Sequence, residues 1–314
     1  MAKGDLIATR DAYGQALAKY GAEYPDLVVL DADLSGSTKT SVFAKAFPER
    51  FFQMGIAEQD LMGTAAGLAA AGKIPFASTF AIFATGRAWE QIRNSIAYAR
   101  FNVKVAASHA GLTVGEDGAS HQANEDIALM RAIPGMTVIV PADAIETEQA
   151  VKALLDFEGP AYLRLGRSKV PVVFADDYQF AIGKAATLRD GDQVTIIACG
   201  IMVEAALAAA EQLAVEGISA RVLNMATIKP LDQDAVLAAA RETGAIVTCE
   251  EHNIIGGLGS AVAECVVQHQ PVPMRFIGVK DVFGESGDPA DLLKAYGLTA
   301  GDIIEAVKDV VKAK

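Results

Sequence analysis

One carboxyl group begins an otherwise apolar stretch of the sequence. Glu58 precedes residues 61–72, LMGTAAGLAAAG, whose composition and apolar spacing are typical of a buried helix. An acid near a helix start can be a simple cap, because the exposed N–H groups and the helix dipole stabilise negative charge there. In a dry pocket, burial favours the neutral form of the same group and equips it for proton chemistry. The local sequence leaves both interpretations open.

The densest polar segment is a long loop with two histidines and two acids. Residues 108–126, SHAGLTVGEDGASHQANED, hold His109 and His121, with Glu116 and Asp117 between two glycines. Loops of this length within a compact domain are usually functional. Histidines and acids there can transfer protons or hold substrate hydroxyl groups. A structural zinc site is disfavoured, because the two histidines lack the spacing of a helical ligand pair.

Hydroxyl and aromatic side chains follow two further predicted strands. Ser35 and Ser37 flank Gly36 after the first strand, where they either cap a helix or present donors to an anion. Phe80 and Phe83 are core residues if they lie on a helix. As loop residues after a strand, the same rings can stack on a flat ligand.

Two arginines stand near the two ends of the first predicted domain. Arg10 and Arg167 are either solvated surface charges or phosphate ligands, since the planar guanidinium suits phosphate groups. In the second half, residues 250–259, EEHNIIGGLG, place a histidine and a glycine turn before a helix. The glycine pattern matches neither common phosphate-loop motif, so we expect this turn to serve interface packing.

Composition excludes several classes of protein. The chain has 314 residues, 52% of them hydrophobic, and a net charge of −12, which disfavours nucleic acid as a partner. We expect no membrane association, since no apolar run is long enough and the N-terminus lacks a signal core. Cys199, Cys249 and Cys265 show no metal or disulfide spacing. Cys199 and Cys249 end apolar runs, so we expect these two to be buried thiols, and we expect a cytoplasmic location.

Short apolar runs alternate with helical patterns along the whole chain. Continuous apolar strands between helices predict an α/β fold with two doubly wound, mostly parallel sheets covered on both faces. The predicted strands are residues 27–31, 74–78, 103–108, 136–141, 161–165, 194–199, 220–225, 245–250 and 274–279. The predicted helices are residues 61–72, 86–100, 121–133, 144–157, 203–217, 233–244, 259–270 and 299–313.

The periodic pattern weakens near the middle of the chain. Pro171 and the acidic pair Asp176 and Asp177 lie in a stretch with little periodicity. We therefore expect one domain over residues 1–170, a linker over 171–184 and a second domain over 185–314.

Several stretches, in order, resemble the transketolase family. They are DADLSGST (31–38), GIAEQD (55–60), STFAIF (78–83), GEDGASHQ (115–122), EEHNIIGGLG (250–259) and FGESG (283–287). The resemblance covers nearly the whole chain but only the second half of a full-length transketolase. It implies a pyrimidine-binding domain for thiamine diphosphate, followed by a transketolase C-terminal domain.

The first half of a transketolase carries a Gly-Asp-Gly segment that, with a divalent metal, holds the diphosphate, and this sequence has no such segment. The resemblance therefore implies the C-terminal subunit of a split transketolase. It also implies a separate N-terminal subunit that binds Mg²⁺ or Ca²⁺, whereas this chain holds no metal. A homodimer of this chain within a heterotetramer is the expected assembly.

The resemblance also assigns roles to individual residues. Glu58 matches the glutamate that contacts a nitrogen of the aminopyrimidine, and Leu34, Phe80 and Phe83 match residues that pack on the thiamine. His121 matches a histidine near the reacting carbon and is, with Glu58, an expected catalytic residue. The expected substrate-binding residues, which would hold sugar hydroxyls and phosphate, are Arg10, Ser37, His109, Asp117, His121 and Arg167.

Two features differ from the usual transketolase pattern. Gln59 follows Glu58 where a histidine is common. The position of a third aromatic residue that packs on the pyrimidine falls near Gly86, so we expect a residue of the segment 84–89 to fill that part of the pocket. The expected reaction is transfer of a two-carbon ketol unit between ketose and aldose phosphates in the pentose phosphate pathway. The alternatives are a 1-deoxyxylulose-5-phosphate synthase, a 2-oxoacid dehydrogenase beta-type subunit and a dimerising α/β scaffold without activity.

Overall fold

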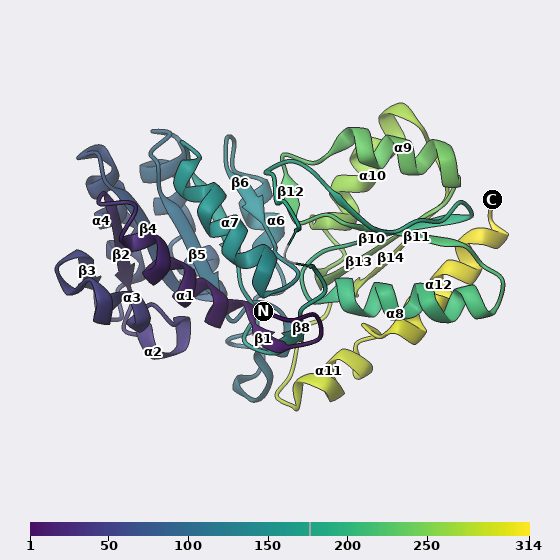
Figure 1. Cartoon of the computed structure of the whole chain (residues 1–314), viewed down its shortest axis with the longest axis horizontal. Helices are drawn as coiled ribbons and strands as arrows, with labels where there is room; N and C mark the ends of the chain where they lie inside the picture. Colours follow the sequence, from purple (N-terminus) through teal and green to yellow (C-terminus); the bar gives the residue numbers. More distant parts are fainter. Residues whose placement is uncertain (176) are drawn as a thin grey trace.

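A computed structural model describes residues 1–175 and 177–314 of the chain. Two sheets with a mostly parallel arrangement lie next to each other, each between layers of helices (Figure 1). The fold class expected from the sequence is confirmed. None of the helices in the described ranges is long and apolar enough to cross a membrane.

The first half of the chain forms six strands of a seven-stranded sheet in the order β12-β6-β7-β5-β4-β2-β3. Only β12 (Thr227–Lys229), from the second half, is antiparallel to its neighbour. The six strands from the first half are β2 (Leu27–Asp31), β3 (Phe51–Gln53), β4 (Ile74–Phe80), β5 (Lys104–Ser108), β6 (Thr137–Ile139) and β7 (Ala161–Arg164). The short strands β1 (Leu6–Ala8) and β8 (Lys169–Pro171) pair separately.

Helices cover both faces of this sheet, as the continuous apolar strands require. One face packs on α1 (Thr9–Gly21), α3 (Ser41–Ala46) and α7 (Ala144–Asp156), and the other on α4 (Glu58–Ala70), α6 (Asp126–Arg131) and the π-helical turn η3 (Ile92–Ala97). The shorter helical elements are α2 (Ser35–Thr38), η1 (Pro48–Arg50), η2 (Phe83–Arg87), α5 (Trp89–Gln91) and η4 (Leu112–Asp117).

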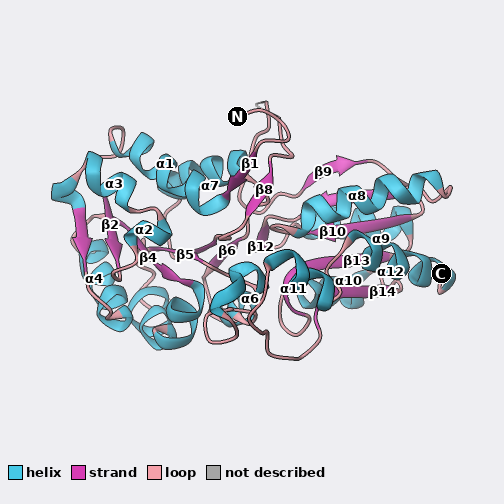
Figure 2. Ribbon diagram, turned by 90° about the horizontal axis from the view of Figure 1, so that it is seen from below, coloured by secondary structure: helices cyan, strands magenta, loops and turns pink. Residues whose placement is uncertain are grey.

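The second half forms a five-stranded sheet in the order β14-β13-β10-β11-β9, with only β9 antiparallel (Figure 2). Its strands are β9 (Ala186–Arg189), β10 (Val194–Ala198), β11 (Ala220–Asn224), β13 (Ile246–Asn253) and β14 (Met274–Val279). Its helices are α8 (Met202–Val215), α9 (Gln233–Thr243), α10 (Leu258–His269), α11 (Pro289–Ala295) and α12 (Ala300–Lys312).

The two halves are joined by shared structure. Strand β12 (Thr227–Lys229) belongs to the second half of the chain but pairs with β6, at the edge of the seven-stranded sheet. One hydrophobic cluster also runs from α4 through β6 to α9 and α10. This continuity fixes the second half against the loops that follow β5.

All nine predicted strands are present. Six of the eight predicted helices run close to their expected bounds, and the other two differ. The segment 86–100 is helical, but π-helical turns flank only a short α-helical stretch. The helix predicted over 121–133 is wrong in its first part, because α6 begins only at Asp126. Cys199 and Cys249 are buried free thiols, as expected, and Cys265 is a buried free thiol as well. Asp176, part of the expected linker 171–184, lies outside the described residues.

Candidate active site

The expected site residues gather at the carboxyl ends of β2, β4 and β5. These strands are parallel neighbours, with Asp31 opposite Ser78 and Phe80 opposite Ser108, so their last residues meet at one edge of the sheet. Ligands of open parallel sheets bind at this edge. The segments that follow the three strands therefore lie close together, at the carboxyl end of the sheet.

Four aromatic rings form a contiguous cluster at this edge. The Phe80 ring stacks on His109 with centroids 3.8 Å apart and lies nearly parallel to Phe83 at 5.9 Å. His121 meets Phe83 edge-on at 5.4 Å and Phe80 at 6.4 Å. Phe80 closes β4 and Phe83 begins η2, so neither belongs to a buried α-helix, and the reading as stacking residues fits the geometry better.

Glu58 is the first residue of α4, and its side chain is only 2% exposed. Its two carboxylate oxygens each lie 2.9 Å from Nη1 of Arg87, whose side chain is half exposed. The expected apolar surroundings are therefore incomplete: a guanidinium group faces the acid. The Arg87 guanidinium also lies over the Phe83 ring, 4.7 Å from its centroid, so Glu58 joins the aromatic cluster through Arg87.

Arg10 connects the loops after β2 and β5. Its Nη1 donates to the Ser37 carbonyl and approaches His109 Nε2, both at 3.1 Å, and its buried Nε has no hydrogen-bond partner among the described residues. Burial lowers the pKa of His109 to about 3, and Arg10 and Arg167 add to the effect. His109 is therefore a neutral imidazole at physiological pH.

The acids and the second arginine lie on the rim of the cluster. Arg167 Nη1 is 3.4 Å from Glu116 and 3.6 Å from Asp117, and it donates to the Val114 carbonyl. All three charged side chains are at least one-third exposed. His121 is half-buried beside them, with its Nδ1 2.9 Å from Ser120 Oγ. The positions of these groups leave them accessible to a polar ligand.

The second half of the chain holds the histidine loop in place. The Thr113 N–H donates to Glu251 at 2.6 Å, the Gln122 amide donates to the Glu285 carbonyl at 2.9 Å, and Ser286 donates to the Glu116 carbonyl at 2.6 Å. An isolated bridge between Ala110 and Ala123 closes the base of the loop. Asp117 and His121 are thus positioned by two sheets together.

Asp31 organises the loop after β2, and sequence reasoning gave it no role. This fully buried carboxylate accepts from the Leu34 N–H at 2.6 Å, from Thr38 at 2.6 Å and from Thr40 at 2.8 Å. Burial raises the pKa of Asp31 against these hydrogen bonds. The backbone N–H and carbonyl of Leu34 form hydrogen bonds with Asp31 and Thr38. The expected contact of the Leu34 side chain with thiamine remains a prediction.

Arg87 lies in the segment 84–89, which was expected to supply the substitute for the third aromatic, but sequence reasoning did not single it out. It is the single charge in the segment FATGRAW, directly after the two phenylalanines, and that isolation was the available signal. Its position depends on η2, because a π-helical turn rather than an α-helical one ends at Arg87. Such turns are frequent at functional sites.

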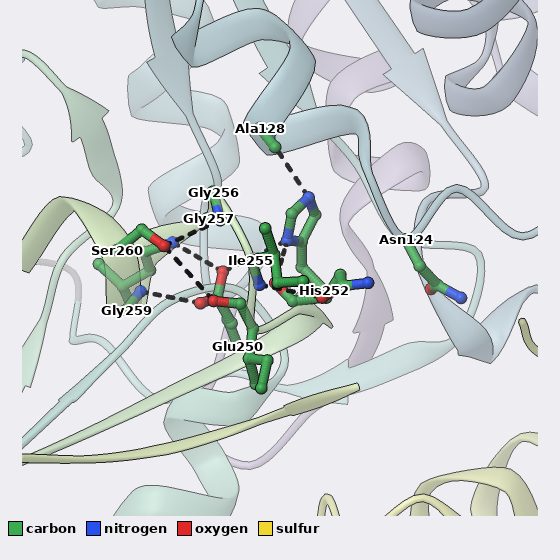
Figure 3. A network of polar contacts seen from close by, with 12 residues as sticks. Asn124, Ala128, Glu250, His252, Ile255, Gly256, Gly257, Gly259 and Ser260 are labelled. Carbon is green, nitrogen blue, oxygen red and sulfur yellow. Dashed lines mark hydrogen bonds and ion pairs between the residues drawn. The ribbon is translucent and has the colours of Figure 1, made fainter. Parts of the chain in front are cut away.

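The glycine turn of the second half serves packing (Figure 3). The Glu250 carboxylate accepts from the N–H groups of Leu258 and Gly259 at the start of α10, at 2.7 and 2.8 Å. His252 Nε2 accepts from the Ala128 N–H at 3.3 Å, which attaches β13 to α6. A carboxylate of the chain itself thus takes the N–H groups that a phosphate loop would offer to a ligand.

The residues of this site fit the aminopyrimidine ring of thiamine diphosphate better than they fit its diphosphate group. A flat aromatic stack adjoins a buried carboxyl group, as an aminopyrimidine needs. Within residues 1–175 and 177–314, no group of three or more His, Cys, Asp or Glu side chains is arranged to hold a metal ion.

Comparison with known proteins identifies the family. Residues 5–173 match the pattern of "Transketolase, pyrimidine binding domain", and residues 183–303 match that of "Transketolase, C-terminal domain". The chain belongs to the transketolase family. This transketolase chain is 50% identical to the putative transketolase C-terminal section of Methanocaldococcus jannaschii, over 96% of both chains.

Other relatives show what part of a transketolase is present. Human transketolase is 41% identical over 98% of this chain but only 50% of its own length. A solved split gene transketolase, described as an inactive beta4 tetramer, is 60% identical with a TM-score of 0.92, covering 98% of this chain and 99% of that one. The chain therefore corresponds to the C-terminal section of a split transketolase, in a transferase family that depends on thiamine diphosphate.

Proposed function

We propose that this chain supplies the ring-binding half of a thiamine diphosphate site and transfers a two-carbon ketol unit between sugar phosphates together with a separate N-terminal subunit. One observation carries the proposal. An unbroken series of contacts runs from Glu58 through Arg87 and Phe83 to Phe80, His109 and Arg10. A proton-handling acid, a stacking surface and a phosphate-type donor set are thereby parts of one site.

In this proposal each cofactor-side residue has one task. Glu58 holds a proton at a ring nitrogen, at the start of a helix and shielded from water. Phe80 and Phe83 would offer the ring an aromatic surface on which to stack. The bound coenzyme supplies the carbon nucleophile, and the protein supplies placement and proton control. The N-terminal subunit would hold the diphosphate through Mg²⁺ or Ca²⁺.

The substrate side would bind the anionic end of a sugar. Arg10 and Arg167 can donate charge-assisted hydrogen bonds to a phosphate, with Ser37 and the neutral His109 beside Arg10. Asp117 and His121 would contact sugar hydroxyls and the reacting carbon. A 6-deoxy-6-sulfo-D-fructose transketolase subunit from Clostridium sp. is 45% identical, so a sulfonated sugar is a substrate to compare with phosphates.

Helix α4 offers a face for self-association. Gly63 and Gly67 lie on its exposed side, with open space where a side chain would stand, and Ile56 just before it is 78% exposed. Small residues on a helix face allow close approach of another helix. We propose that a second copy of this chain packs there, and the similar split-gene chain forms a tetramer.

The experiment is reconstitution. We expect no turnover from this chain alone, and ketol transfer from a ketose phosphate after addition of the N-terminal subunit, thiamine diphosphate and Mg²⁺. Release of carbon dioxide from pyruvate instead would indicate a deoxyxylulose-phosphate synthase or dehydrogenase activity. An assembled complex that shows neither activity would indicate a scaffold. Substitutions at Glu58, His121 and Arg167 that alter no activity of the assembled complex would indicate the same.

A further inference from the structure

Arg87 occupies the place at Glu58 that the proposed function reserves for a ring nitrogen. A single guanidinium nitrogen, Nη1, lies 2.9 Å from both carboxylate oxygens, so one N–H group sits between them. The guanidinium carbon lies 4.7 Å from the Phe83 ring centroid. A flat, nitrogen-bearing group over Phe83 that points a donor at Glu58 has the features required of an aminopyrimidine at the same position.

The segment that carries Arg87 is held at a second point. Gln59, the neighbour of Glu58, donates its side-chain amide to the Arg87 carbonyl at 3.2 Å. The first two residues of α4 thus hold both the backbone and the side chain of residue 87. The Arg87 side chain is half exposed, whereas Glu58 is 2% exposed, so the arginine can move into solvent and the acid cannot.

A buried carboxylate needs a partner, and the partner of Glu58 in this structure is Arg87. Leaving an ionised acid unpaired in a dry site is costly, so Glu58 keeps either the guanidinium or another donor. Both carboxylate oxygens are engaged by Arg87. A ring donor aimed at the same two oxygens would compete with Arg87 for them.

We propose that Arg87 is a positioning residue that competes with the thiamine ring for Glu58 and thereby sets the affinity of the site for the coenzyme. This inference rests on the proposed function. Without coenzyme, the Arg87 guanidinium compensates the charge of the Glu58 carboxylate. When the thiamine ring binds, the Arg87 side chain moves into solvent. If the Glu58–Arg87 ion pair had only a structural role, it would persist with the coenzyme bound.

The test measures thiamine diphosphate binding to the complex of this chain with the N-terminal subunit, in the presence of Mg²⁺. We expect Arg87→Gln to lower the dissociation constant for thiamine diphosphate about fivefold, which corresponds to the free energy of one partly exposed ion pair. The same substitution should lower the unfolding midpoint without coenzyme and leave it unchanged at saturation. Arg93→Gln, an exposed arginine nearby that bonds Asn94, is the matched control and should change neither quantity.

Two further variants complete the experiment. Arg87→Lys keeps the charge but loses the flat group over Phe83, and its dissociation constant should fall between those of the wild type and Arg87→Gln. In a Glu58→Gln background, Arg87→Gln should no longer change affinity. Weaker or unchanged binding in Arg87→Gln would overturn the competition while leaving the proposed function intact. Absence of coenzyme binding in the wild-type complex would overturn both.

Discussion

Arg10 donates to His109: Arg10 Nη1 lies 3.1 Å from His109 Nε2, while His109 Nδ1 lies 2.8 Å from Ser108 Oγ. A guanidinium group cannot accept a hydrogen bond, so Nε2 must be the acceptor and Nδ1 carries the proton. The neutral ring then donates from Nδ1 to Ser108. The site thereby holds an uncharged histidine in contact with Arg10, and this contact fixes its tautomer.

The first prediction concerns the charge of His109. Burial together with Arg10 and Arg167 lowers the pKa of this ring to about 3, so it should stay neutral with Nδ1 protonated throughout pH 5 to 8. Nitrogen NMR of histidine-labelled protein measures both the charge and the tautomer. A signal assigned to His109 that titrates near its ordinary value of 6.5 would refute this assignment.

The second prediction concerns recognition of the anionic end of the substrate. Arg167→Gln removes a charged donor and should raise KM for a phosphorylated sugar roughly tenfold to a hundredfold, with a smaller effect on kcat. Steady-state kinetics of the reconstituted complex measure this. Arg241→Gln, at an exposed position near the end of α9, is the control. Equal KM values in the wild type and Arg167→Gln would remove Arg167 from the substrate site.

The third prediction concerns the support of the histidine loop by the second half. Gly111 has φ +79°, and a Cβ there would overlap the buried Glu251 carboxyl group. Gly111→Ala should therefore lower the free energy of unfolding by roughly 2–4 kcal/mol. Gly217 has φ +81° but open space around it, so Gly217→Ala should cost only about 1 kcal/mol. Chemical denaturation compares the two, and equal losses would show that strain alone, without the contact to Glu251, explains the effect.

Much of the fold follows from the sequence because the apolar strands are long and continuous. Residues 27–31 and 194–198 are entirely buried, as their composition predicts. The sequence did not predict β12, since a three-residue strand across the boundary between the two halves has no local signal. The π-helical turns of 83–97 were also missed, because apolar spacing does not separate them from an α-helix.

The candidate site was predictable to the extent that its residues follow strands or belong to a recognisable motif. Glu58, Phe80, Phe83 and His109 come together because parallel strands end at one edge. Arg87 was not predicted, since its contact with Glu58 joins elements distant in sequence. Asp31 was not predicted either, because an acid that ends a buried strand looks like any other strand end until its three hydrogen bonds are seen.

The fourth prediction concerns pH and the junction between the two halves. Burial raises the pKa of Glu251 from 4.5 to about 7, so the folded chain keeps a proton that the unfolded chain has released. The contribution of Glu251 to stability therefore falls as pH rises from 4.5 to 7, by roughly 3 kcal/mol. Glu251→Gln keeps an acceptor for the Thr113 N–H and should lack this loss.

The comparison is a difference between two pH profiles of the free energy of unfolding. His252, whose pKa burial lowers to about 4, contributes with the opposite sign between pH 4 and 6.5 in both proteins, so its effect cancels. Relative to the wild type, Glu251→Gln should gain stability steadily from pH 4.5 to 7. A flat difference would contradict a protonated Glu251 in the folded chain.

The central claim is that Glu58 controls the proton at the ring of bound thiamine diphosphate. Its most direct test is the rate at which the thiazolium C2 proton exchanges with deuterated solvent in the complex with the N-terminal subunit, measured by quenched-flow NMR at saturating coenzyme. We predict that Glu58→Gln slows this exchange by about a hundredfold or more, the usual effect of removing a positioned acid or base. Exchange at the wild-type rate in a variant that still binds the coenzyme would contradict the account.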